Sequence, residues 1–231
     1  MKVFKFGGAS VKDPESLRNM VNVLKKFNEP LVVVVSAMGK TTNALEVVLH
    51  NFFRQNKDLN QSFNTVKDFH LNIINKLFKP GAKLYEEIED LFNVLNHKLK
   101  EEPSMTYNYE YDQIVPYGEL FSTLIVEAYL NQQGISCKWI DIRKNLKTDN
   151  NYREAHVDFG LSEELIRKTF NFNDSKVYVT QGFIGSTRDN LSTTLGREGS
   201  DYTAALIAYF LDAESVTVWK DVPGLLNADP K

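Results

Sequence analysis

The chain has almost no cysteine and no concentration of positive charge. Cys137 is the single cysteine among 231 residues, which excludes an internal disulfide framework and favours a reducing compartment such as the cytoplasm. Lysine and arginine together number 27 against 30 acidic residues, and no basic run is interleaved with aromatic side chains. These features argue against a nucleic-acid partner, so a local site must hold any anionic ligand.

Metal-binding histidine patterns and long apolar segments are also missing. The four histidines are scattered without the spacing of metal ligands, so we expect no zinc or other metal site of the protein's own. No signal peptide or membrane-spanning apolar run is seen, and we expect a cytoplasmic protein with no membrane partner. Cys137 lies in a strand-like segment, which favours a buried thiol over a nucleophile. The composition, 42% hydrophobic and 25% charged, is typical of a globular domain.

Strand-like and helical segments alternate along most of the chain. Apolar runs at 2–6 and 31–35 flank a helical pattern that starts at Pro14 and extends to about Phe27. This order predicts an α/β fold with a parallel sheet. Further strands are expected at 136–140, 176–180 and 215–219, and further helices near 162–170 and at 201–211.

The hydrophobic pattern changes between residues 44 and about 100. Apolar residues recur there at three- and four-residue steps, with a break at 79–81, which predicts an inserted helical subdomain. Residues 101–111 are expected to form a loop. A further helix is expected over 120–130, opened by the segment 117–119.

Two glycine-containing turns indicate anion binding. The run Thr193 to Asp201 contains Gly196 and Arg197 directly before a helix, whose first amides favour a bound anion. The run is equally consistent with a capped turn that serves stability alone. At the other end of the chain, the strand at 2–6 leads into two glycines whose amides can wrap an oxyanion. Neither turn has the spacing of a Walker A loop or of a dinucleotide-binding motif.

Six motifs occur in order along the chain, and together they resemble the aspartokinases of the amino-acid kinase superfamily. They are Lys5 to Val11, Val34 to Asn43, Tyr117 to Glu119, Gln181 to Phe183, Thr193 to Asp201 and Val218 to Lys231. The resemblance covers the whole chain. It implies a three-layer α/β/α sandwich with a mainly parallel central sheet, and an ATP-dependent phosphotransferase. The reaction implied is transfer of the γ-phosphoryl group of ATP, with Mg²⁺, to the β-carboxylate of L-aspartate, giving 4-phospho-L-aspartate. This is the first step toward lysine, threonine and methionine.

The resemblance also implies how the transfer site works. Lys5 neutralises charge between donor and acceptor oxygens, and Asp201 holds Lys5 in place and lies near the magnesium of Mg-ATP. Hydrogen bonds come from the amides of two glycines and from two hydroxyl groups: Gly7, Gly8, Ser10 and Ser36. No general base is needed, because the β-carboxylate of aspartate is already ionised at neutral pH.

The substrate's remaining groups have complementary partners in the motifs. By resemblance, Arg197 binds a carboxylate of aspartate, Glu119 receives the α-ammonium group, and Thr42 and Ser200 add hydrogen bonds. Two alternatives stay open at this point. By spacing alone, Glu119 is more typical of an acid that favours the dipole at a helix start, and Thr42 is also typical of a helix N-cap, a role it could combine with substrate binding.

ATP is expected toward the last motif, with contacts from Lys220, Asp221, Leu226 and Lys231. Many aspartokinases have threonine, tyrosine and arginine where Lys220, Leu226 and Lys231 stand. Glu198 also departs from the pattern, because it replaces a common glycine beside Arg197. An unpaired carboxylate there would repel aspartate, so Glu198 must point away from the pocket or pair with a cation.

The family's catalytic domains continue beyond the last motif, and regulatory ACT domains usually follow. We therefore expect residues 1–231 to form an incomplete catalytic domain with low activity alone and an exposed hydrophobic face, within a longer protein that is a homo-oligomer. Two alternatives to aspartate kinase activity remain. One is a kinase acting on glutamate, N-acetylglutamate, carbamate or uridylate, and the other is an inactive nucleotide-binding fragment.

Overall fold

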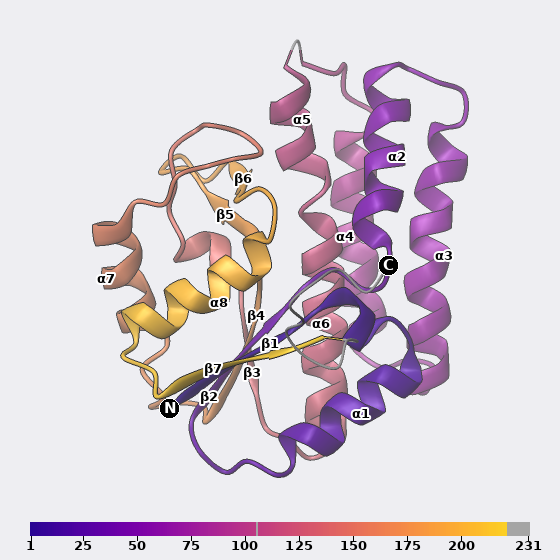
Figure 1. The fold of residues 1–231 in the computed structure, drawn as a ribbon. Coiled ribbons are helices and arrows are strands. Elements are labelled where there is room, and N and C mark those ends of the chain that lie inside the picture. The colour runs from indigo at the N-terminus through magenta and orange to yellow at the C-terminus, as the bar shows by residue number, and fades with distance from the viewer. Residues whose placement is uncertain (105, 221–231) are drawn as a thin grey trace, which may run out of the picture.

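A five-stranded parallel sheet forms the centre of the molecule. The computed structural model describes residues 1–104 and 106–220, and the strands lie in the order β3-β4-β2-β1-β7 (Figure 1). They are β1 (Lys2–Phe6), β2 (Leu31–Val35), β3 (Lys138–Ile140), β4 (Val177–Gln181) and β7 (Ser215–Trp219). The register pairs Val35 with both Phe6 and Gln181, and Phe6 with Trp219. The carboxyl ends of these strands therefore meet at one edge, where open α/β sheets bind ligands.

Helices cover both faces of the sheet, as β2 illustrates. All five of its residues are buried, as expected for a strand covered on both sides. Val32 and Val34 pack with the side chains of α7 (Phe159–Thr169) and α8 (Gly199–Phe210). Val33 and Val35 pack on the other face with α1 (Pro14–Leu24) and α6 (Tyr117–Gln132). The predicted three-layer α/β/α sandwich is confirmed.

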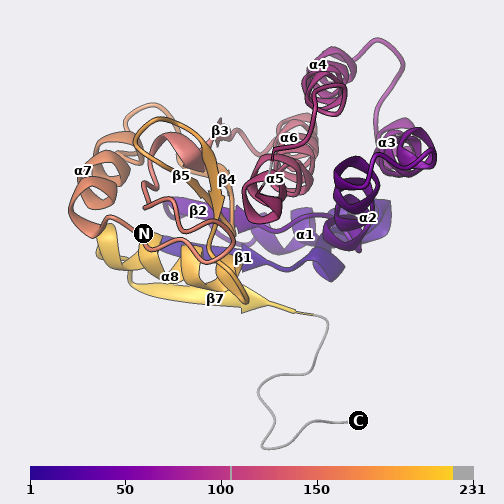
Figure 2. The same cartoon turned by 90° about the horizontal axis from the view of Figure 1, so that it is seen from above.

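A helical region stands beside this sandwich. The predicted helical pattern corresponds to α2 (Thr41–Phe53), α3 (Leu59–Leu77) and α4 (Leu84–Lys98). Helices α3 and α4 lie on the side of the molecule away from α7 and α8 (Figure 2). Hydrophobic side chains of α2, α3 and α4 join the same core as those of α1 and α6, so the region is packed against the sandwich.

The loop predicted at 101–111 is wrong in its second half, because helix α5 spans Tyr107–Ile114. Tyr111 and Ile114 are buried on one face of this helix, which contacts α2. Glu110 is also fully buried and is paired with Lys98 at 3.1 Å. Polar and aromatic residues in this segment thus owe their helical conformation to contacts with the preceding helices, which local sequence does not reveal.

The sequence also did not predict an antiparallel hairpin of β5 (Ile184–Ser186) and β6 (Ser192–Thr194). Helix boundaries differ modestly from expectation: α1 ends at Leu24, and α7 begins at Phe159 after its N-cap Asp158. The 3-10 turns η1 (Gly8–Val11) and η2 (Ile142–Lys144) complete the elements.

Two further expectations concern surfaces and the single cysteine. Cys137 is buried, and burial raises the pKa of its thiol to about 12, consistent with a structural residue. On the edge strand β7, Val216 and Val218 are 40% and 43% exposed. Docking of further chain against such a face stays a prediction. Among the described helices, none has the length and apolarity that crossing a membrane requires.

Candidate functional site

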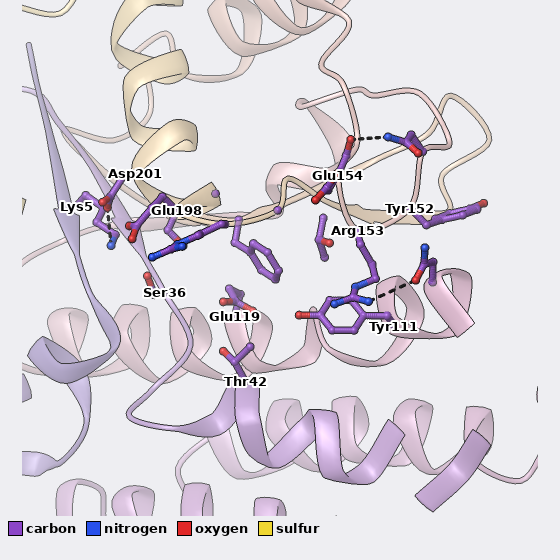
Figure 3. A pocket seen from close by; sticks show the side chains of 18 residues that line it. Lys5, Ser36, Thr42, Tyr111, Glu119, Tyr152, Arg153, Glu154, Glu198 and Asp201 are labelled. Carbon is purple, nitrogen blue, oxygen red and sulfur yellow. Dashed lines mark hydrogen bonds and ion pairs between the residues drawn. The ribbon is translucent and has the colours of Figure 1, made fainter. Parts of the chain in front are cut away.

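A cavity of about 710 Å³ opens at the carboxyl edge of the sheet. The ends of β1 and β2, the starts of α2 and α6, the hairpin, and the first turn of α8 all contribute residues to it. Lys5, Asp201 and Glu198 lie at one end and Arg153 and Tyr111 at the other, with Glu119 and Thr42 between them (Figure 3).

Lys5 and Asp201 form an ion pair at the first end of this cavity. Lys5 Nζ lies 2.7 Å from Asp201 Oδ1, and Lys220 Nζ lies 2.9 Å from Asp201 Oδ2. Burial acts to raise the pKa of Asp201, but hydrogen bonds from the two lysines outweigh it and hold that pKa below its usual value. Asp201 is thus an ionised carboxylate shared between two cations, contributed by β1 and by the residue directly after β7.

The glycine turn after β1 packs tightly against the neighbouring turn. A Cβ atom on Gly8 would lie 2.6 Å from the Ala37 carbonyl oxygen, so this position requires glycine. The Gly7 amide and the Ser10 hydroxyl group both donate to the Trp219 carbonyl oxygen, at 3.2 and 3.1 Å. Both groups thus donate within the protein in this structure, and their hydrogen bonds to phosphate stay a prediction. No described backbone acceptor takes the Gly8 amide.

Glu119 is buried in the floor of the cavity, with 2% of its surface exposed. Its Oε1 accepts a 3.1 Å hydrogen bond from the Ala37 amide, and among the described residues no group donates to Oε2. Burial raises the pKa of Glu119 to about 8, although the Ala37 amide and the charge of Lys5 oppose that shift. A helix-dipole role alone would not bury this carboxyl group with one oxygen unpartnered. The arrangement suits a ligand cation.

Thr42 also lines the cavity, and the alternative that it serves as a helix N-cap is wrong. Helix α2 begins at Thr41, its N-cap position is Lys40, and no side chain caps it. The hydroxyl group of Thr41, and not that of Thr42, bonds back to the Met38 carbonyl oxygen at 2.6 Å. The Thr42 side chain therefore remains available to a ligand.

The turn before α8 contributes Arg197, Glu198 and Ser200 to the cavity. Glu198 has a φ of 56°, in the left-handed region that favours glycine. Its carboxylate lies 3.6 Å from Lys220 Nζ, so the expected pairing with a cation is observed. Arg197 is exposed, and none of the ion pairs among the described residues includes it. Ser200 lies buried in the first turn of α8.

The sequence and the fold match known proteins. The model of the amino acid kinase family matches residues 1–231. The chain belongs to the amino acid kinase family. Among relatives, lysine-sensitive aspartokinase 3 of Escherichia coli (strain K12) is 33% identical over 236 residues, which are 99% of this chain and 51% of that protein. The chloroplastic bifunctional aspartokinase/homoserine dehydrogenase 2 of Arabidopsis thaliana is 32% identical over 243 residues, or 99% of this chain and 26% of that protein.

Solved structures give the same result for the kinase fold. The structure of E. coli aspartokinase III in complex with aspartate and ADP has a TM-score of 0.91 and 31% identity. The match covers 100% of this chain and 51% of the E. coli aspartokinase III chain. This amino acid kinase chain thus spans about half the length, or less, of the relatives it matches. Family membership and these relatives support a kinase.

Most of the predicted site residues of this family member come together. Lys5, Ser36, Thr42, Glu119, Arg197, Ser200 and Asp201 all line the one cavity. Gly7 lies beside it, because a Cβ at this position would be 3.7 Å from Lys5 Nζ. Ser10 faces a different hollow, next to Trp219 and α1. Three predicted nucleotide contacts, Asp221, Leu226 and Lys231, lie outside the described residues.

Several cavity residues were not predicted. Arg153 and Tyr111 line the end of the cavity opposite Lys5, and Thr194 of β6 lies in its wall. Asp112 lies behind them and accepts hydrogen bonds from the Thr194 amide, the Thr194 hydroxyl group and the Arg153 amide, at 2.9, 2.8 and 3.0 Å. Burial raises the pKa of Asp112 to about 6. The polar run at 149–151 predicts a turn before Arg153 but does not indicate which cavity that turn borders.

Proposed function

We propose that this chain carries the active site of an aspartate kinase, which transfers the γ-phosphoryl group of ATP to the β-carboxylate of L-aspartate. The observation that carries the proposal is the pairing of Lys5 with Asp201 at one end of a cavity whose floor holds Glu119. A cation for the transferred group and a buried carboxyl group for an ammonium group are the two features that phosphorylation of an amino acid requires.

In the proposed reaction, an oxygen of the β-carboxylate attacks the γ-phosphorus of ATP in line with the leaving group. A phosphorus–oxygen bond forms to aspartate, and the bond from the γ-phosphorus to the β,γ-bridging oxygen breaks. ADP departs with that electron pair, so atoms and charge balance without a proton transfer. Lys5 reduces the repulsion between the anionic partners, and Asp201 fixes the position of its ammonium group through the 2.7 Å contact.

The substrate groups are assigned by charge. Glu119 as a carboxylate binds the α-ammonium group, Arg197 binds a carboxylate, and the hydroxyl groups of Thr42 and Ser200 complete the acceptor site. Residues at this cavity also suit ATP with Mg²⁺. Magnesium is usually held by one or two carboxylates together with phosphate oxygens, and Asp201 would supply one such carboxylate by exchanging its contact with Lys220 for the metal. Bound magnesium would neutralise phosphate charge.

Trapping of acyl phosphate with hydroxylamine tests this proposal. The protein that contains this chain should form aspartyl hydroxamate in the presence of ATP, and Lys5→Ala should reduce the rate by about 10³-fold. Lys2→Ala is the matched control, because Lys2 is on the same strand but at the far end, paired with Glu29 at 3.2 Å. Product from glutamate and none from aspartate would contradict the substrate assignment. A negligible effect of Lys5→Ala would contradict the mechanism.

A further inference from the structure

Arg153 stands at the end of the cavity opposite Lys5 and Asp201 (Figure 3). Glu119 and Thr42 lie between these two ends. Arg153 precedes α7 in the chain and belongs to none of the six motifs that first indicated the site. Its position therefore raises a separate question, namely which part of a ligand this end of the cavity meets.

The position of Arg153 is fixed from several directions. Its φ is 75°, an uncommon conformation for a residue with a side chain, and its amide donates to Asp112 Oδ2 at 3.0 Å. Its guanidinium carbon lies 4.5 Å from the centre of the Tyr111 ring, and Nη1 donates to Asn108 Oδ1 at 3.5 Å. The Tyr111 hydroxyl group is in turn held by Glu46 at 3.1 Å. Residues of helix α5 thus contact both the backbone and the side chain of Arg153.

The guanidinium group has no carboxylate partner among the described residues. The ion pairs there include neither Arg153 nor Arg197, whereas Lys5 and Lys220 share Asp201. Asp112 accepts the backbone amide of Arg153 and not its side chain. A planar cation that is stacked on an aromatic ring and left without an acid keeps its bidentate face for an anion.

We infer that Arg153 determines specificity by binding the α-carboxylate of the amino-acid substrate together with Arg197. The inference rests on the proposed function. With the β-carboxylate at Lys5 and the α-ammonium group at Glu119, the α-carboxylate is the substrate group that remains to face the end of the cavity opposite Lys5. Arg153 then distinguishes a free amino acid from the same residue in a peptide or an α-amide, because only the free form presents an anion there.

The experiment compares L-aspartate with its α-amide, isoasparagine, which keeps the β-carboxylate as acceptor but has no charge at the α-position. In Arg153→Gln, kcat/KM for aspartate should fall about 10- to 100-fold. The value for isoasparagine should stay within about twofold, so selectivity between the two substrates shrinks. Arg153→Lys should restore only part of that selectivity, because it keeps the charge without the planar fork. Arg167→Gln is the control, since Arg167 is exposed and pairs with Glu163 and Asp212.

The variant Arg153→Gly separates a role of Arg153 in substrate selectivity from a role in folding. Glycine accepts a φ of 75° without strain, so this variant should fold with an unchanged or higher melting temperature and still lose selectivity. Equal losses with both substrates, or unchanged selectivity in Arg153→Gly, would overturn the role of Arg153 while leaving the kinase activity in place. Absence of acyl phosphate from aspartate in the unmodified protein would overturn this inference and the proposed function together.

Discussion

Glu119 is a buried carboxyl group with one oxygen unpartnered among the described residues, and its pKa is raised to about 8, chiefly by burial. A bound ammonium group favours the ionised form of such a group. We therefore expect aspartate binding to expel a proton from Glu119. The perturbation is the pH of the binding reaction, combined with the substitution Glu119→Gln.

The magnitude follows from the raised pKa. With a pKa of about 8, Glu119 is protonated in about nine-tenths of free molecules at pH 7, so binding should release about 0.9 proton. Affinity for aspartate should weaken about fivefold from pH 8 to pH 7 and about 50-fold from pH 8 to pH 6, because Glu119 is already half protonated at pH 8. Affinity falls and does not rise at lower pH, because only the carboxylate form of Glu119 pairs with the ammonium group of the ligand. Besides Glu119, the titratable groups that line the cavity are Lys5, Tyr111, Tyr152, Arg153, Glu154, Arg197, Glu198 and Asp201. Burial raises the pKa of Tyr111 far above this range.

Isothermal titration calorimetry in buffers of different ionisation enthalpy measures the proton release directly. Glu119→Gln should abolish the release and weaken binding at pH 8 by about 30-fold or more. The same variant should raise the melting temperature of the free protein at pH 8.5, because the penalty from the raised pKa of Glu119 grows as pH rises from 4.5 to about 8 and is complete above it. Glu127→Gln is the matched control. Burial raises the pKa of Glu127 on the same helix, but Glu127 does not line the cavity.

Two results would refute this reasoning. One is an aspartate affinity that stays constant from pH 6 to pH 8. The other is a calorimetric enthalpy that does not depend on the buffer, which would mean that Glu119 is already ionised in the free protein or does not meet the ammonium group. Proton release that persists in Glu119→Gln would assign the proton to another group.

Three further predictions concern the scaffold of the site. Asp112→Ala should lower the free energy of unfolding by about 2–4 kcal/mol in urea titrations, because it leaves buried amides without an acceptor; an effect below 1 kcal/mol would contradict this. Burial lowers the pKa of His70 to about 4, so His70 should contribute a loss of about 3 kcal/mol in stability as pH falls from 6.5 to 4, against the gain expected from the raised pKa values of Glu119 and Asp112. His70→Phe should remove that contribution, and an unchanged dependence of stability on pH would count against it. Gly8→Ala should cost about 1–3 kcal/mol, whereas Gly160→Ala, where a Cβ meets nothing within 4 Å, should be neutral or stabilising; similar costs at both would argue against the close contact.

The sequence predicted those parts of the fold whose signals are local. Strand β2 is an uninterrupted apolar run, and α3 shows a three- and four-residue period, so neighbouring residues alone identify them. Strand β6 is Ser-Thr-Thr, with no apolar pattern, and it is bonded to Asp112 on a helix 82 positions earlier. Helix α5 likewise depends on burial against α2. Both required tertiary contacts that no short window of sequence contains.

The same distinction applies within the site. The proximity of Lys5 and Asp201 was predictable because it belongs to a recurring family pattern. Arg153 was not predictable, because its place in the cavity depends on a left-handed backbone conformation and on stacking against Tyr111. Lys220 was expected beside phosphates, and in the structure its ammonium group forms ion pairs with Asp201 and Glu198. Its location depends on the pairing of β7 with β1, which brings the end of β7 next to the start of α8.

Glu198 and Lys220 each depart from the family pattern, one by adding an anion and the other by adding a cation. The structure brings them to 3.6 Å, and both side chains are substantially exposed, so their attraction adds at most about 1 kcal/mol to stability. Their main effect is on the net charge at the end of the cavity that holds Lys5. The left-handed φ at Glu198 explains why glycine is common at this position, and a carboxylate there alone would repel an acidic substrate. Because Lys220 offsets that carboxylate and also contacts Asp201, the two departures cancel and the end of the cavity that holds Lys5 keeps its charge balance.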